Sequence, residues 1–290
     1  MSKQIICFGE TLFDMLPDGA MPGGAPMNVG IHLTYNGLLP VVISRVGNDE
    51  PGKQLLTFLQ EKGISTQWIQ TDSKYQTGIV QANVSDRTHV TYDIVAPVAW
   101  DFITYQEEVA ALVKQSDVFV FGSLAARHAV SQETLLKYLA VAPFKVFDVN
   151  LRPPHYTPER TQLFLQQANI VKMNHLELAE IVKWHGKQLP EKQAMEYLKT
   201  LFNWETLIVT RGENGAAILS RDGYAEHGGF VVNVEDTIGS GDAFLATYIS
   251  SYLRHQPVAE ALEKACKIGA FVATQKGATP FYIPEETELR

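Results

Sequence analysis

The segment DTIGSGDAF places a carboxylate, Asp242, directly after Gly239, Ser240 and Gly241. The next residues, 243–253, contain no Gly or Pro and predict a buried helix. Glycine permits backbone angles at which successive N–H groups converge, and the helix dipole adds positive charge at the same point. We therefore expect a cradle for an anion such as a phosphoryl group, with Asp242 beside it as a general base. The alternative is structural, because an aspartate in a first helical turn also caps free N–H groups.

Two other nucleotide-binding patterns are incomplete or missing. The segment GNDEPGKQ, residues 47–54, has the G-x-x-x-x-G-K spacing of a P-loop, but Gln54 replaces the Ser or Thr that binds Mg²⁺. Asp49 and Glu50 would place negative charge where phosphates lie, so we predict an ordinary strand-to-helix turn. No G-x-G-x-x-G follows the first strand-like run, where GETLFD stands instead, which argues against a Rossmann-type dehydrogenase.

Short apolar runs alternate along the chain with stretches whose apolar residues recur every three or four positions. This alternation is typical of βαβ units, so we predict an α/β fold with a doubly wound, mostly parallel sheet and helices on both faces. The polar residues that follow the strands should then gather at one edge of the sheet. Strands are expected within residues 4–10, 41–47, 117–122, 145–150, 169–174 and 206–212, and helices within 51–63, 131–142 and 177–187.

One segment breaks the alternation. Residues 77–101 read as two strands around a turn at 85–87, and residues 11–16 are also strand-like. We expect these segments to form a small β lid on a single domain that spans residues 1–290. The alternative is an extension of the main sheet at its edge. The aromatic residues that such a lid could place over a ligand are His89, Tyr92 and Trp100.

The composition is that of a globular protein, with 46% hydrophobic and 19% charged residues among 290. The formal net charge of −8 and the lack of a basic cluster argue against nucleic acid as a partner. Cys7 and Cys266 are the only cysteines and are interpreted as buried thiols in a reducing compartment. We find no signal peptide and no run of about 18 apolar residues, so we expect no membrane partner and a cytoplasmic location.

Further motifs extend the pattern across nearly the whole chain. PGGAPMNVG, RVGNDEPGK and DTIGSGDAF, with GETLFD, DVNLR, MNHLE, VTRGENG and KGA, together resemble the PfkB (ribokinase-like) family of sugar kinases. Among its members the similarity is greatest to fructokinases. The resemblance implies a ribokinase-like fold, ATP with Mg²⁺ as phosphoryl donor, and transfer to a primary hydroxyl of a sugar. It also implies that Asp242 is the base and that Gly239, Ser240 and Gly241 form the anion hole.

The resemblance assigns Asp14, Gly24 and Asn28 to the sugar hydroxyls. A carboxylate that accepts two hydrogen bonds and an amide that both donates and accepts are suited to a polyol. Arg152 would lie near the sugar or the phosphates. The structural alternatives are a turn acid for Asp14, a turn glycine for Gly24, a helix cap for Asn28 and a salt bridge at the sheet edge for Arg152.

The nucleotide side is implied by the same resemblance. Asn174 and Glu177 match an N-x-x-E element that acts on Mg²⁺ and phosphates through water, as expected for an ion that keeps its hydration shell. A capping box at a helix N-terminus would explain the same two residues. Thr210 and Gly212 match the strand end under the nucleotide phosphates.

Some family members also bind a monovalent cation such as K⁺ beside the anion hole. The acid that matches this site is Asp236, together with the loop at residues 272–281. Phe281 stands where ribokinase-like examples have a hydroxyl residue, which departs from the pattern.

The leading hypothesis is phosphorylation of D-fructose to fructose 6-phosphate. A 2-keto-3-deoxygluconate kinase, in which Arg152 would face a carboxylate, and a nucleoside kinase are the alternatives within the family. From another class, a non-catalytic sugar or nucleotide sensor is possible, although the catalytic positions are all present. The apolar face of the lid hairpin favours a homodimer formed through the lid.

Overall fold

The first apolar run forms strand β1 (Gln4–Phe8), whose side chains alternate between two cores. Ile6 and Phe8 pack against one layer of helices, whereas Ile5 and Cys7 pack against the other. A strand that is buried on both faces lies in the interior of a sheet with helices on both sides. The residues that the computed structural model describes are 3–16, 19–86 and 89–289, and for residues 16, 82–86 and 89–92 it describes the backbone alone.

Nine strands of the described chain form the main sheet, in the order β13-β12-β11-β10-β9-β8-β1-β4-β5. The strands from β11 to β5 are parallel, and β12 and β13 continue the sheet in antiparallel pairs. Every strand predicted from the sequence is present, whereas β5, β12 and β13 were not predicted. The bounds are β4 Leu39–Gly47, β5 Ile69–Asp72, β8 Val118–Gly122, β9 Lys145–Asp148, β10 Ile170–Asn174, β11 Thr206–Thr210, β12 Ala216–Ser220 and β13 Gly223–His227.

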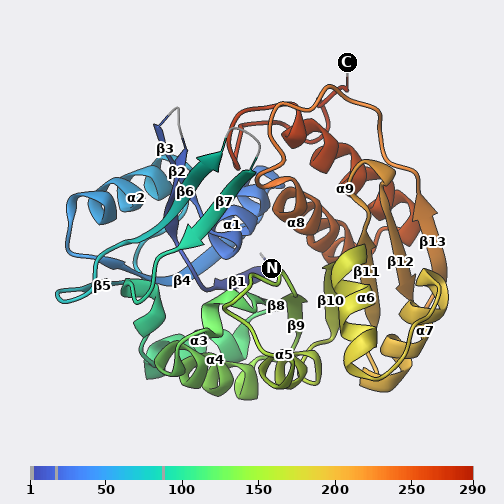
Figure 1. Ribbon diagram of the computed structural model, residues 1–290, viewed down its shortest axis with the longest axis horizontal. Helices are drawn as coiled ribbons and strands as arrows, with labels where there is room; N and C mark the ends of the chain where they lie inside the picture. The colour runs from blue at the N-terminus through green and yellow to red at the C-terminus, as the bar shows by residue number, and fades with distance from the viewer. Residues whose placement is uncertain (1–2, 17–18, 87–88, 290) are drawn as a thin grey trace.

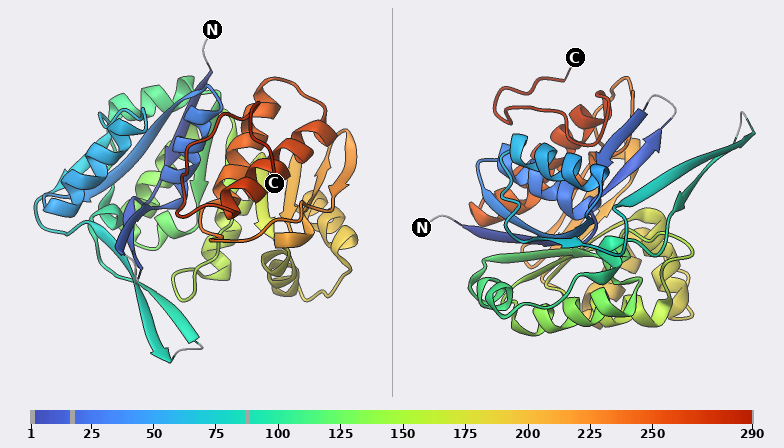
Figure 2. Two further views of the ribbon diagram at one scale, coloured as in Figure 1. Left: turned by 90° about the horizontal axis from the view of Figure 1, so that it is seen from above. Right: turned by 90° about the vertical axis from the view of Figure 1, so that its left-hand side faces the viewer.

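Two layers of helices cover the sheet, as the right-hand view of Figure 2 shows. One layer consists of α3 (Glu107–Gln115), α4 (Ala129–Val141), α5 (Pro158–Leu165), α6 (His175–Trp184) and α7 (Glu191–Phe202). The other consists of α1 (Ala25–Tyr35), α2 (Glu50–Glu61), α8 (Ser240–Leu253) and α9 (Val258–Ala273). Short 3-10 helices are η1 (Ala99–Phe102), η2 (Leu124–Ala126) and η3 (Gly212–Asn214). The predicted helices correspond to α2, α4, α6 and α8, and the predicted α/β class is confirmed (Figure 1).

A second sheet has the strand order β3-β2-β6-β7 and shares no strand with the main sheet. Its β2 and β6 are parallel neighbours, and the other two pairs are antiparallel. The β6–β7 hairpin projects from the body of the molecule in both views of Figure 2. The turn predicted at residues 85–87 falls partly on residues 87–88, outside the described residues. The bounds are β2 Leu12–Leu16, β3 Gly19–Gly23, β6 Gly78–Asp86 and β7 His89–Ile94.

The base of this hairpin is fixed by Arg127. Its guanidinium donates to both carboxylate oxygens of Asp101, at 2.7 and 2.8 Å, and to the carbonyls of Ile94 and Val95, at 3.1 and 2.6 Å. It also lies 3.9 Å from the ring centroid of Trp100, which is fully buried. Trp100 therefore packs the base of the hairpin and does not cover a ligand, contrary to the expectation. The side chains of His89 and Tyr92 lie outside the described part of the structure.

Candidate functional site

The turn before α8 has a conformation that requires glycine. Gly239 has φ 78°, in the left-handed region, and a Cβ there would overlap the carbonyl oxygen of Ala278. Ser240 follows it and anchors the turn, because its hydroxyl donates to the carbonyl of Gly269 at 2.9 Å. The Ser240 amide donates to the carbonyl of Thr237 at 3.3 Å. Ser240 thus fastens the start of α8 to α9.

Free amides remain at the start of α8. The first hydrogen bond of the helix runs from the amide of Ala243 to the carbonyl of Gly239, at 2.9 Å. The amides of Gly241 and Asp242 precede it and have no acceptor among the described residues. Helix termini of this kind bind anions. Because the Ser240 amide is already used, the arrangement offers an anion the amides of Gly241 and Asp242, with that of Gly239 next to them.

His32 of α1 fixes the loop that packs against Gly239. Its Nε2 lies 2.9 Å from the carbonyl oxygen of Ala278, and its Nδ1 lies 3.2 Å from the hydroxyl of Tyr282. Burial lowers the pKa of His32 to about 4, so the ring is neutral at physiological pH. The loop behind the cradle is therefore held by a neutral hydrogen-bonded ring.

Asp242 is bound directly to α1. The amide nitrogen Nδ2 of Asn28 donates to Oδ2 of Asp242 at 2.8 Å. Asn28 is 3% exposed, and its Oδ1 has no hydrogen-bond partner among the described residues. Loss of hydration raises the pKa of Asp242 to about 7, although the positive charge of Lys172 opposes the shift. The structure thus combines a base that titrates near neutral pH with an unsatisfied buried acceptor, which is suited to a hydroxyl donor.

Replacing Asp242 with asparagine is expected to stabilise the protein at alkaline pH. The folded-state pKa lies above the ordinary value of 3.8, so ionisation destabilises the fold increasingly from about pH 4 to about pH 7 and by a constant amount above it. The neutral amide still accepts from Asn28 and avoids this penalty. We expect the free energy of unfolding to rise by about 1–3 kcal/mol at pH 8 and by less at pH 5, measured by urea denaturation. An equal gain at both pH values would contradict the assigned pKa.

The predicted sugar-binding residues converge from separate elements. Asp14 lies in β2, and burial raises its pKa to about 6. The positive charge of Arg152 lowers the pKa of both Asp14 and Asp242, so the three side chains lie near one another. Arg152 is exposed and forms no salt bridge with any described residue, which rules out the structural alternative for it within the described chain.

Gly24 caps α1 beside the same region. Its φ is 120°, and a Cβ there would overlap the carbonyl oxygen of Glu10. The carbonyl of Gly24 accepts the amide of Asn28 at 2.9 Å, so the glycine places Asn28 on the first turn of α1. Glu10 is buried, and its Oε1 accepts the amide of Ala25 at 3.3 Å. The close contact between Glu10, in the segment after β1, and the start of α1 therefore sets the position of Asn28 relative to α8.

Asn174 and Glu177 form the capping box that was the structural alternative for them. Asn174 Oδ1 accepts the amides of Leu176 and Glu177, both at 2.9 Å. Glu177 Oε2 accepts the amide of Asn174, and Oε1 accepts the amide of Leu151, both at 2.8 Å. Each carboxylate oxygen retains a lone pair that water can use. No cluster of three or more metal-binding side chains occurs among the described residues. A single carboxylate such as that of Glu177 is nevertheless suited to Mg²⁺ that keeps its water ligands.

A cavity of about 740 Å³ borders the cradle. Thr210 and Gly212 line it at the end of β11, and Gly241 lines it at the start of α8. Its remaining walls are largely apolar, so it can hold a ligand with an anionic end and an apolar end. Sequence reasoning did not predict these walls. The signals that could have indicated them are the glycine pair at 228–229 and the small residues of α9. The apolar lining includes Phe230, Val231, Val232, Phe244, Cys266 and Ala270.

Asp236 joins the loop that precedes α8 to the loop that follows α9. Its Oδ1 accepts the amide of Ile238 at 2.9 Å, and its Oδ2 accepts the amide of Gly277 at 3.3 Å. Phe281, which departs from the cation-site pattern, is 69% exposed and packs edge-on against Tyr35. Asp236 thus has a structural role that requires no bound cation.

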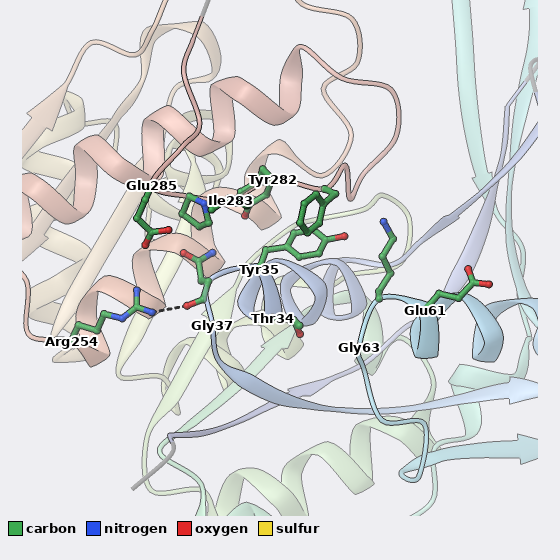
Figure 3. A pocket seen from close by; sticks show the side chains of 13 residues that line it. Thr34, Tyr35, Gly37, Glu61, Gly63, Arg254, Tyr282, Ile283 and Glu285 are labelled. Atoms are coloured by element: carbon green, nitrogen blue, oxygen red, sulfur yellow. Dashed lines mark hydrogen bonds between the residues drawn. The ribbon is translucent and has the colours of Figure 1, made fainter.

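A second cavity, of 720 Å³, lies at the opposite end of α1 (Figure 3). Figure 3 shows Tyr35 and Tyr282 on one side of it and Arg254 on another, where Arg254 donates to the carbonyl of Asn36 at 2.6 Å. Phe281, the last residue of the loop matched to a cation site, lines this cavity, but none of the predicted catalytic, sugar-binding or nucleotide-binding residues does. It is separate from the candidate site.

Comparisons with known proteins identify related sequences and folds. The model described as pfkB family carbohydrate kinase matches residues 19–286. A fructokinase of Solanum tuberosum is 27% identical over 99% of this chain and 94% of its own length. The crystal structure of a fructokinase with bound ATP from Xylella fastidiosa has a TM-score of 0.83 at 23% identity, covering 96% of this chain and 94% of that one.

A second solved structure is similar to the same degree. Aminoimidazole riboside kinase from Salmonella enterica, complexed with aminoimidazole riboside and an ATP analogue, has a TM-score of 0.82 at 23% identity. The match covers 98% of each chain. The fold is thus ribokinase-like over nearly all of the described chain. Separately, no helix in the described part of the chain is long and apolar enough to cross a membrane.

Proposed function

Because the chain belongs to the pfkB family of carbohydrate kinases, we propose that it transfers the γ-phosphoryl group of ATP to a primary hydroxyl of D-fructose and forms fructose 6-phosphate. The observation that carries the proposal is the Asn28–Asp242 pair at the start of α8. It places a base of pKa about 7 between free helix amides and an unsatisfied buried amide oxygen. The relatives named fructokinase favour fructose as the acceptor.

The proposed reaction is an in-line displacement at phosphorus. The sugar hydroxyl gives its proton to Asp242 as its oxygen attacks the γ-phosphorus, and the bond from that phosphorus to the β,γ-bridging oxygen breaks to release ADP. The amides of Gly241 and Asp242 stabilise the negative charge that develops on the transferring group. Asn28 Oδ1 accepts a hydrogen bond from a sugar hydroxyl, while Asp14 and Arg152 contact the sugar from the opposite side.

The cavity of 740 Å³ would hold the nucleotide, with its phosphates toward Gly241 and its base against the apolar wall. Thr210 and Gly212 would lie under the phosphates. Glu177 would contact Mg²⁺ through water, and the bound ion would supply charge neutralisation on the phosphates. Asn174 would lie beside it, toward the phosphates. A K⁺ ion near Asp236 is proposed only as an activator, and replacing K⁺ with Na⁺ in the assay tests it.

A 2-keto-3-deoxygluconate kinase is the second candidate. The observation that favours it is the exposed guanidinium of Arg152, which has no described salt bridge and could bind a carboxylate. A panel of D-fructose, 2-keto-3-deoxygluconate and a nucleoside, with ADP release as readout, separates the candidates. We expect the highest kcat/KM with D-fructose. ADP release with none of the three would favour the sensor alternative.

Replacing Asn28 with alanine is expected to weaken sugar binding selectively. The change removes the buried acceptor and the hydrogen bond to Asp242, so KM for the sugar should rise by about 10–100-fold while KM for ATP stays nearly constant. Initial-rate measurements with each substrate varied in turn provide the test.

Asn36→Ala is the matched control for that variant. Asn36 is another buried asparagine, at the end of α1, where its side chain donates to the carbonyl of His32 at 2.8 Å. Its loss should lower stability without changing KM for the sugar. If both variants raised that KM equally, Asn28 would have no specific role in sugar binding.

The chain is proposed to act as a single domain in which the second sheet is a lid that closes over the sugar and excludes water. We also propose that two lids pair in a homodimer. Light scattering at assay concentration tests the dimer, and a monomeric mass would contradict it. A cytoplasmic location accords with the proposed use of ATP and sugar.

A further inference from the structure

Lys172 is the only charged residue in strand β10, where Ile170, Val171 and Met173 are fully buried. It is itself only 8% exposed. Its Nζ lies 2.9 and 3.1 Å from the two carboxylate oxygens of Asp148, its register partner on strand β9. Lysine is rarely buried in the interior of a parallel sheet, because removing an ammonium from water is unfavourable even when it is paired.

The ammonium of Lys172 lies against the start of α8. A Cβ built on Gly241 would be 3.0 Å from Nζ of Lys172, and that Nζ is the nearest atom it would meet. Gly241 supplies one of the free amides and precedes Asp242. The buried ion pair is therefore in contact with the anion cradle. Two apolar side chains of similar size would hold the sheet together equally well, so sheet stability does not explain the charges.

The geometry points to Lys172 as a positioning residue: held by Asp148, it places a fixed positive charge under the cradle, which favours the carboxylate form of Asp242 over the protonated form and favours an anion at the amides of Gly241 and Asp242. This inference rests on the proposed kinase reaction, because it assigns Lys172 a role in that reaction. The Lys172–Asp148 pair does not itself touch the sugar and acts through Asp242.

The charges around Asp242 come from several elements. Lys172 on β10 and Arg152 after β9 lower its pKa, Asp148 on β9 raises it, and the hydrogen bond from Asn28 on α1 lowers it. The influence of Lys172 is the largest of these after that of burial. Removing Lys172 should therefore raise the pKa of Asp242, whereas neutralising Asp148 should lower it.

The test compares Lys172→Met, Asp148→Asn and the double variant with the unmodified protein. The pKa of Asp242 is obtained from the pH dependence of the ¹³C chemical shift of its carboxyl carbon in the free protein. The resonance is assigned as the one that is missing from the Asp242→Asn spectrum. We expect the pKa to be lowest in Asp148→Asn, then to increase through the unmodified protein and the double variant to Lys172→Met. The pKa of Asp242 in the two single variants should differ from that in the unmodified protein in opposite directions, each by roughly one pH unit.

Lys145→Met is the matched control, because Lys145 lies at the other end of β9 and should leave the Asp242 titration unchanged. The acidic limb of the kcat/KM profile for the sugar should follow the same order, and the titration of ATP itself is common to all variants. A shift in the same direction in both single variants, or none in either, would overturn the proposal. The NMR titration needs no turnover, so failure of the proposed kinase function would not be mistaken for failure of this inference. If Lys172→Met does not fold, the Asp148→Asn and double variants still decide the order.

Discussion

Replacing Asp242 with asparagine is expected to lower kcat by about 10²–10⁴-fold, the contribution of a positioned general base. The amide cannot accept the proton of the sugar hydroxyl, but it can still accept the hydrogen bond from Asn28 that spans 2.8 Å in the unmodified protein. The cradle amides and the nucleotide cavity are unchanged. The Kd for ATP, measured by calorimetry, should therefore stay within about threefold of the original value, a difference of less than 1 kcal/mol.

The same variant provides its own control for folding. Because Asp242→Asn is expected to be more stable than the unmodified protein at pH 8, a loss of turnover could not be attributed to unfolding. Turnover close to that of the unmodified protein would mean that another group accepts the proton. Loss of ATP binding together with turnover would mean that Asp242 supports the nucleotide site and is not the base.

Replacing Gly239 with alanine is expected to reduce kcat by about 10²–10³-fold, which is typical for loss of one anion-hole donor. Alanine is strained at a φ of 78°, and its Cβ would overlap the carbonyl oxygen of Ala278. The Gly239 turn or the loop at residues 276–278 must then move, and the free amides of α8 move with them. Stability should also fall by about 1–2 kcal/mol because of the strained backbone.

Gly186→Ala separates the two effects of that change. Gly186 has a φ of 68°, but a Cβ there would meet nothing within 4 Å, and the residue follows the far end of α6. This control should lose similar backbone stability and keep full kcat. If Gly239→Ala were active at the level of Gly186→Ala, the shape of the cradle would not matter for the reaction.

Local signals in the sequence were sufficient for most of the main sheet. Strand β8 is apolar throughout and β1 is apolar after Gln4, and the Gly-Ser-Gly segment before a helical run without Gly or Pro marks the start of α8. The capping box at Asn174 was also readable as an alternative. Strands β5 and β13 were missed because they mix polar with apolar residues and lie at the two edges of the sheet, and β12 was missed because it pairs antiparallel to β11 without a helix between them.

Features that depend on three-dimensional contacts could not be read from the sequence. Trp100 appeared available to a ligand because its partner, Arg127, lies 27 positions away in the chain and packs on it only in the fold. Asp148 is the first residue of the DVNLR motif and Lys172 lies in the strand predicted at residues 169–174, but their ion pair depends on the register of β9 and β10. Only the structure showed that the Ser240 amide is bound to Thr237, which shifts the expected anion hole toward Gly241 and Asp242.

A crystal structure with ADP, aluminium fluoride and D-fructose would test the central claim most directly. Aluminium fluoride takes the place of the transferring phosphoryl group, so its position reports where transfer occurs. We predict that it accepts hydrogen bonds from the amides of Gly241 and Asp242, with a primary hydroxyl of the sugar between it and the Asp242 carboxylate. Aluminium fluoride bound away from these amides, or a sugar without contact to Asp242, would contradict the account.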